Sequence, residues 1–291
     1  MHRLCLFLVA ALPLLAQQPA PAKRGGKIAT PPPTQPPLQA ADPAQLPEGV
    51  EHFDLILLLG QSNMKGRGVM PDTPKRDPRL LMMHLRDDHW YLARHPLHLT
   101  GDAQTFAGHD NAGVGPGLAF AEQVVGDGTA VGLVPCAVGG SSILLWQKGA
   151  KLYENAVRRA RLAMASAPGK VRLRGVLWLQ GEANANPQEL PQHAARLRAL
   201  VENLRADLGQ PKLPFIACTI GEMNEDPARL ADQKAMNQIL LDLPSAVPGT
   251  ACVDARDLRS HIGDRVHFDT AAQEEMGRRM AAAWRPLVGS P

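Results

Sequence analysis

Short apolar runs alternate with longer helical periodicities along most of this chain. The five apolar runs cover residues 53–59, 130–135, 171–179, 213–220 and 250–253. The helical periodicities cover residues 118–125, 152–167, 190–208 and 270 to about 284. Continuous apolar runs are typical of parallel strands that are covered on both faces. The alternation therefore predicts one doubly wound α/β domain over residues 50–291, with a mostly parallel five-stranded sheet flanked by helices.

Three parts of the chain lack this alternation. Residues 1–16 have a basic start, an apolar run and a polar end, and the run is short against the roughly 20 residues of a membrane span. This pattern predicts a signal peptide and a secreted or periplasmic protein with no membrane span after cleavage; an uncleaved anchor is the alternative. Residues 17–49 hold nine prolines, which predicts an extended, disordered linker. Residues 65–115 show no clear pattern of either kind. We expect them to form a long excursion, an irregular segment outside the predicted strands and helices, beside the functional site.

Composition and cysteine count exclude several classes of protein. The formal net charge is +3 and aromatic residues make up 4% of the chain, which argues against a nucleic-acid partner. Three cysteines remain once Cys5 leaves with the signal peptide, and an odd number argues against a disulfide framework. These three cysteines form no CxxC motif and no close pair with a histidine. We therefore expect neither a metal nor another cofactor.

Polar clusters follow three of the predicted strands and precede the last helix. They are GQSNM at 60–64, GGSS at 139–142, QGE at 180–182 and DRVH at 264–267. Ligands of such sheets bind beyond the carboxyl ends of the strands, so these clusters are expected to meet. Taken singly, Ser62 could be a helix cap and Asp264 a turn residue. Together, a serine, a glycine pair, an amide, an acid and a histidine are the parts of an acyl-transfer site.

The same blocks carry a resemblance to a known family. GQSNM, GGSSI, WLQGEA and DxxH followed by FD resemble the SGNH hydrolases, most closely the carbohydrate esterases that include acetylxylan esterases and sialate O-acetylesterases. The similarity runs roughly from Asp54 to Trp284. SNM with QGE, in place of the GDS of lipase-like members, points to sugar acetates rather than lipids. The resemblance implies a flavodoxin-like SGNH hydrolase fold and a carboxylic ester hydrolase.

The resemblance also implies catalytic roles. Ser62 becomes the nucleophile, His267 its general base and Asp264 the acid that orients the imidazole, in agreement with the chemistry of a serine that needs a base to remove its proton. In some members the glutamate of the QGE block takes this role, which makes Glu182 a rival or helper for Asp264. Chain proximity favours Asp264, which is three residues from His267.

Oxyanion and substrate contacts follow from the same resemblance. The oxyanion is expected to meet the backbone N–H groups of Ser62 and Gly140 and the side-chain amide of Gln180, with Gly139 replacing Gly140 if the turn shifts by one residue. Several relatives carry an aspartate after QGEA or QGES, where this chain has Ala-Asn-Ala-Asn at 183–186, so an orienting acid is not expected at that point. Candidate substrate-binding residues are Asn63, Met64, Arg67, His109 and Asn111.

These inferences predict an exported carbohydrate O-acetylesterase that acts through a covalent acyl-serine, with xylan or sialic acid-like sugars as substrates. Two alternatives stay open. The site could act on other short-chain esters or transfer the acyl group, or the chain could be a catalytically silent sugar-binding protein. Retention of Ser62, Gln180, Asp264 and His267 argues against the silent alternative.

Overall fold

A seven-stranded sheet forms the middle layer of the protein. The computed structural model describes residues 35–71, 77–108, 110–167 and 169–289. The strands are β1 (His52–Gly60), β2 (Leu80–Met83), β3 (Trp90–Leu92), β4 (Thr129–Pro135), β5 (Val171–Leu179), β6 (Phe215–Cys218) and β7 (Thr250–Val253). Their order is β3-β2-β4-β1-β5-β6-β7, and only β3 runs antiparallel to its neighbour. The predicted α/β class with a mostly parallel sheet is confirmed.

The sheet reverses its winding at β1. The five predicted strands are all present and lie in the order β4-β1-β5-β6-β7, which is the flavodoxin-like order. The predicted count of five strands is corrected to seven, because the 65–115 excursion contributes β2 and β3 at the β4 edge. A doubly wound sheet binds ligands where its winding reverses. The carboxyl end of β1 is therefore the expected position of a site.

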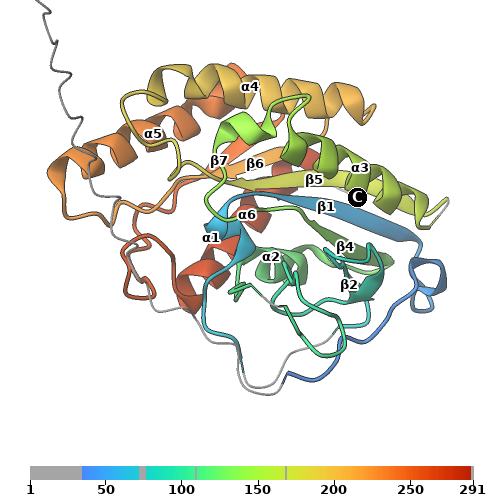
Figure 1. Cartoon of the computed structure of the whole chain (residues 1–291). Helices are drawn as coiled ribbons and strands as arrows, with labels where there is room; N and C mark the ends of the chain where they lie inside the picture. Colours follow the sequence, from blue (N-terminus) through green and yellow to red (C-terminus); the bar gives the residue numbers. More distant parts are fainter. Residues whose placement is uncertain (1–34, 72–76, 109, 168, 290–291) are drawn as a thin grey trace, which may run out of the picture.

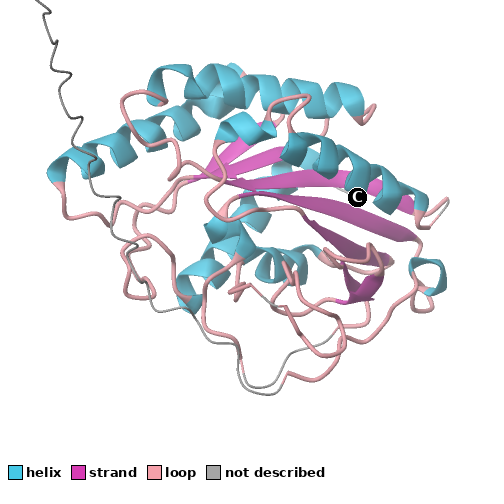
Figure 2. Ribbon diagram, viewed as in Figure 1, coloured by secondary structure: helices cyan, strands magenta, loops and turns pink. Residues whose placement is uncertain are grey.

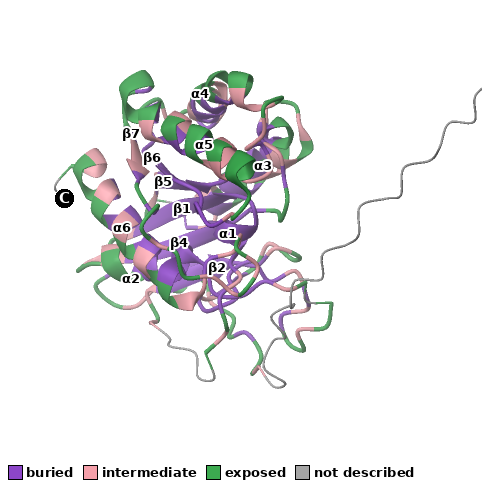
Figure 3. Ribbon diagram, turned by 90° about the vertical axis from the view of Figure 1, so that its left-hand side faces the viewer, coloured by how far each residue is buried: buried purple, intermediate pink, exposed green. Residues whose placement is uncertain are grey.

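Helices cover both faces of the sheet (Figures 1 and 2). One face carries α3 (Lys151–Ala165), α4 (Leu190–Asp207) and α5 (Pro227–Ala246), and the other carries α2 (Pro116–Val124) and α6 (Thr270–Val288). Side chains of β1 alternate between the two cores, with Leu55 and Leu57 facing α3 and α4 and with Ile56 and Leu58 facing α2 and α6. Figure 3 shows the buried strands enclosed between these layers.

Shorter elements complete the fold, and one long helix was not predicted. The short helices are α1 (Ser62–Lys65), η1 (Pro43–Gln45) and η2 (Ile143–Trp146). Asp226 caps the start of the unpredicted helix α5, and its carboxylate accepts the N–H groups of Ala228 and Arg229.

Within the described residues, no helix is both long enough and apolar enough to span a membrane. Cys136, directly after β4, and Cys218, in β6, are buried free thiols, and Cys252, in β7, is a partly buried one.

The structure differs from the predicted linker over residues 38–45. Leu38 is buried and its N–H donates to Ala103 O at 2.8 Å, while the N–H of Ala41 donates to Trp90 O at 3.0 Å. Backbone pairing of this kind leaves no side-chain period in the sequence, so proline content alone suggested a linker up to residue 49. The predicted signal peptide at 1–16 and the linker up to residue 34 lie outside the described residues.

Candidate active site

Ser62 stands at the carboxyl end of β1, where the sheet reverses its winding. Gly60 ends the strand with φ of 128°, and a Cβ at this position would lie 2.2 Å from Leu179 O, so the close approach of β5 requires glycine. Ser62 then begins α1. Among the described residues, no acceptor pairs with the backbone N–H of Ser62. The first residue of α1 therefore presents both a hydroxyl and an unpaired N–H.

Ser62, His267 and Asp264 form one chain of hydrogen bonds. His267 Nε2 lies 2.8 Å from Ser62 Oγ, and His267 Nδ1 lies 2.5 Å from Asp264 Oδ2. The backbone N–H groups of Val266 and His267 donate to Asp264 Oδ1 at 3.0 and 2.9 Å. Burial opposes ionisation, but the hydrogen bonds from His267 and Val266 hold the pKa of Asp264 below its usual range. An ionised Asp264 accepts a hydrogen bond from His267 Nδ1–H, which keeps the proton on Nδ1 and leaves Nε2 free to act as a base.

Glu182 lies behind this chain and reaches it through Asn63. Asn63 Nδ2 donates to Glu182 Oε1 at 2.5 Å and to Val266 O at 3.1 Å. Burial raises the pKa of the Glu182 carboxyl, whose Oε2 is enclosed and has no hydrogen-bond partner among the described residues. Of the two candidate acids, Asp264 is the one in hydrogen-bond contact with His267.

Asn63 is a buried residue that links several elements through hydrogen bonds, and the expectation that it binds substrate is wrong. Its side chain is 0% exposed, and Asn63 Oδ1 accepts the N–H of Phe268 at 3.1 Å and Gln273 Nε2 at 3.4 Å. With its two donated bonds, the amide joins α1 to the QGE loop, to the loop that carries His267 and to α6. The expectation for Met64 is also wrong, because its side chain packs into the core beneath α1.

The glycine turn after β4 lies against Ser62. Gly140 has φ of 70°, which favours glycine, and within the described part of the chain the N–H groups of Gly139 and Gly140 have no acceptor. A Cβ on Gly139 would lie 3.9 Å from Ser62 Cβ, whereas a Cβ on Gly140 would have no heavy atom within 4 Å. Of the two glycines, Gly139 is therefore the closer neighbour of the serine, which favours the shifted turn.

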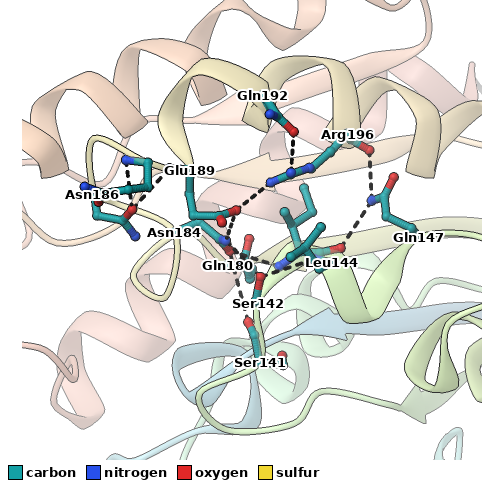
Figure 4. Close-up of polar contacts among 12 residues, drawn as sticks. Ser141, Ser142, Leu144, Gln147, Gln180, Asn184, Asn186, Glu189, Gln192 and Arg196 are labelled. Atoms are coloured by element: carbon teal, nitrogen blue, oxygen red, sulfur yellow. Dashed lines mark hydrogen bonds and ion pairs between the residues drawn. The ribbon is translucent and has the colours of Figure 1, made fainter. Parts of the chain in front are cut away.

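Gln180 does not fill its expected role as an oxyanion donor. Its side chain is 0% exposed, and Nε2 donates to Ser141 O at 3.2 Å and to Asn184 Oδ1 at 2.6 Å. Both amide hydrogens are thus bound to protein acceptors, as Figure 4 shows. The resemblance placed Gln180 near the oxyanion, but the side chain instead holds the segment that follows the two glycines.

Arg67 and Asn111 lie at the edge of the site. Arg67 Nη1 donates to Asn111 O at 3.1 Å, and Nη2 lies 3.5 Å from the position of a Cβ on Gly139. Burial lowers the pKa of Arg67, and the nearby Asp110 and Asp264 oppose this shift. Both residues stay candidates for contact with substrate. His109 lies outside the described residues.

Lys65 is a site residue that the sequence reasoning did not select. The side chain is buried, and Nζ lies 2.6 Å from Asp110 Oδ1 and donates to Asp110 O at 3.0 Å. This ion pair fixes the loop that carries Asn111 beside Arg67. The sequence did contain a signal for this residue, because Lys65 is the one charged residue in the segment GQSNMK at 60–65. In the described ranges, no group of three or more His, Cys, Asp and Glu side chains could hold a metal ion.

A hydrogen-bonded serine, histidine and aspartate at the point where a doubly wound sheet reverses its winding is an arrangement that suits acyl transfer. Residues 52–285 match the family model described as carbohydrate esterase, sialic acid-specific acetylesterase. The chain belongs to this family and is a carboxylic ester hydrolase. The resemblance seen in the sequence is confirmed.

Individual relatives agree with this assignment. A probable carbohydrate esterase of Arabidopsis thaliana is 32% identical over 264 residues, which cover 84% of this chain and 94% of the relative. The X-ray structure of that Arabidopsis protein superposes with a TM-score of 0.67 at 30% identity, covering 79% of this chain and 97% of its own. The crystal structure of NanS superposes with a TM-score of 0.63 at 18% identity, covering 80% of this chain and 97% of its own. The crystal structure of a carbohydrate acetylesterase from Xanthomonas citri superposes with a TM-score of 0.54 at 22% identity, covering 81% of this chain and 56% of its own. The last two support the fold alone.

Proposed function

We propose that this protein is an exported O-acetylesterase that removes acetyl groups from a carbohydrate through a covalent acyl-serine. The observation that carries the proposal is the hydrogen-bonded chain from Ser62 through His267 to Asp264 at the reversal of the sheet. Family membership supports a carbohydrate acetylesterase, and the apolar run at residues 1–16 supports export.

The reaction follows from this geometry in two halves. His267 Nε2 takes the proton of Ser62 Oγ while the oxygen attacks the acetyl carbonyl carbon. The carbonyl oxygen becomes an oxyanion that accepts hydrogen bonds from the unpaired N–H groups of Ser62 and of Gly139, with Gly140 as the neighbouring donor. The intermediate collapses, the C–O bond to the sugar breaks, and the sugar oxygen takes the proton from His267.

Water completes the cycle by the same route. His267 removes a proton from a water molecule, and the hydroxide attacks the acetyl carbon of the acyl-serine. Collapse of the second tetrahedral intermediate returns the proton to Ser62 Oγ and releases acetate. Arg67 and Asn111, at the edge of the site, are proposed to contact the sugar.

The test measures acetate release from acetylated xylan, acetylated sialic acid and acetylated pectin. Ser62→Ala and His267→Ala are each expected to lose at least about 10³ in turnover with an unchanged unfolding temperature. Ser245→Ala, an exposed serine on α5, is the matched control and keeps full activity. Near wild-type turnover in either site variant would overturn the mechanism. A preference for butyrate or longer esters over acetate would favour a different short-chain ester as substrate.

A further inference from the structure

We propose that Asn184 is a positioning residue that holds the glycine turn in the orientation that stabilises the oxyanion; this inference rests on the proposed function. Asn184 lies in the loop after β5 and is 0% exposed. Its Oδ1 accepts the N–H of Ile143 at 2.9 Å and Gln180 Nε2 at 2.6 Å. Its Nδ2 donates to Ser142 Oγ at 2.9 Å and to Glu189 Oε2 at 3.2 Å. One amide therefore uses all its hydrogen-bonding positions, and three of its four partners act on the glycine turn.

These contacts fix the segment that immediately follows Gly139 and Gly140. Asn184 holds Ser142 and Ile143 directly, and it holds Ser141 O through the amide of Gln180. From the other side, Ser141 Oγ donates to Gly60 O at 3.2 Å, and Trp146 Nε1 donates to Ser141 Oγ at 3.1 Å. The turn is thus tied both to the end of β1 and to the loop after β5. A displaced turn would move the N–H groups of the glycines relative to Ser62.

Glu189 determines which way the Asn184 amide faces. Glu189 Oε2 forms an ion pair with Arg196 Nη1 at 2.5 Å, so the carboxylate is held in place as an acceptor. A carboxylate oxygen accepts only from Nδ2, and this leaves Oδ1 for the N–H of Ile143. Figure 4 shows Asn184 between Glu189 and the Ser141–Ser142 segment, with Arg196 beyond Glu189. The same geometry explains why an amide suits this position: an aspartate would place a second negative oxygen about 3 Å from Glu189.

The inference predicts that a change at Asn184 weakens the binding of the transition state and leaves the binding of the substrate almost unchanged. The glycine N–H groups form strong hydrogen bonds to the carbonyl oxygen of the substrate only when this oxygen carries a negative charge. Their displacement therefore lowers kcat and leaves KM almost unchanged. Removal of one oxyanion donor costs about 10²–10³ in kcat, and a misplaced donor costs less. Asn184→Ala is therefore expected to lower kcat about 10- to 100-fold, with a change in KM below about threefold.

The experiment combines Asn184→Ala with a double-mutant cycle. Asn184→Asp is expected to lower kcat because its carboxylate faces Glu189, whereas Glu189→Gln alone stays within about threefold of wild type. The double variant Asn184→Asp/Glu189→Gln recovers kcat to within about threefold, because the new amide can donate to the new carboxylate. Asn186→Ala is the matched control: Asn186 lies in the same loop, and among the described residues its Oδ1 accepts the backbone N–H groups of Gln188 and Glu189 and none from the glycine turn.

A second readout separates positioning from general loss of structure. A simple alkylboronic acid forms a tetrahedral adduct with the serine, and one of its oxygens occupies the oxyanion position. The inhibition constant for Asn184→Ala is expected to rise by the same factor by which kcat/KM falls, while the unfolding temperature of each variant is recorded beside that of Asn186→Ala. Unchanged kcat and boronic acid inhibition in Asn184→Ala overturn the inference. Equal losses in Asn184→Ala and Asn186→Ala, or no recovery in the double variant, overturn it as well. An inactive wild type would instead overturn the proposed function.

Discussion

Replacing Asp264 with asparagine tests which acid orients His267. Asp264 Oδ1 accepts two backbone N–H groups, from Val266 and His267, at 3.0 and 2.9 Å. In Asp264→Asn the amide keeps its oxygen on these two donors, because its NH₂ group cannot accept a hydrogen bond. The NH₂ group then takes the place of Oδ2, which lies 2.5 Å from His267 Nδ1. The imidazole must accept at Nδ1 and carry its proton on Nε2.

The magnitude follows from that change of tautomer. Nε2 lies 2.8 Å from Ser62 Oγ, and once it is protonated it cannot take the serine proton. A tautomer change of this kind costs about 10⁴ in kcat in a well-studied triad, or about 5 kcal/mol of activation free energy. In Glu182→Gln the oxygen stays on Asn63 Nδ2, and no hydrogen bond to His267 is lost. We therefore expect Glu182→Gln to lose less than about tenfold.

The assay compares kcat and kcat/KM of both variants on 4-nitrophenyl acetate, with acetate release from an acetylated sugar as a second substrate. Both substitutions are isosteric, so each variant serves as the control for the other, and thermal unfolding verifies that each is folded. A larger loss in Glu182→Gln than in Asp264→Asn would refute the reasoning. Asp264 would then be a turn residue, and Glu182 would be the orienting acid.

Three further predictions address the surroundings of the triad. Asn63→Ala is expected to lower the free energy of unfolding by about 3 kcal/mol, because it leaves buried hydrogen-bond partners unpaired; a urea titration that finds less than about 0.5 kcal/mol contradicts this. Burial raises the folded-state pKa of Glu182, so its stabilising contribution is complete below the ordinary value of about 4.3 and is lost as pH rises through the raised pKa. As the pH rises above about 4, the unfolding temperature of wild type should therefore fall relative to that of Glu182→Gln. A difference between the two unfolding temperatures that does not change with pH would speak against a raised pKa. Arg67→Ala is expected to reduce kcat/KM on an acetylated sugar by about tenfold or more, in line with a charged hydrogen bond, and an unchanged value removes Arg67 from the substrate site.

The sequence predicted the central strands and the grouping of Ser62, His267 and Asp264 because both depend on local patterns. Fully apolar runs mark buried parallel strands, and polar blocks directly after them fall at one edge of the sheet. The elements that were not predicted lack such patterns. β2 is only four residues long, β3 only three, and α5 has apolar side chains spread around much of its surface. The Asp226-Pro227 pair at the start of α5 was a usable helix-start signal.

The errors at the site concern the direction of side chains. Successive residues of a helix point about 100° apart, so Ser62 faces the histidine while Asn63 and Met64 turn towards the interior. Position in the chain placed all three beside the site, but only packing decides which one is accessible. Gln180 presented the same difficulty, because its amide is bound by Asn184 from the following loop.

Residues 39–41 have a consequence for any shortened form of this protein. β3 is the outermost strand on its side of the sheet, and the N–H of Leu92 donates to Gln39 O at 2.9 Å while Trp90 O accepts the N–H of Ala41 at 3.0 Å. These contacts occupy backbone groups that an uncovered edge strand offers to other chains, the usual starting point for aggregation. A chain cut to begin at Val50, where the apolar pattern starts, would expose that edge and is expected to self-associate. A chain that begins at Gln35 retains the protecting segment.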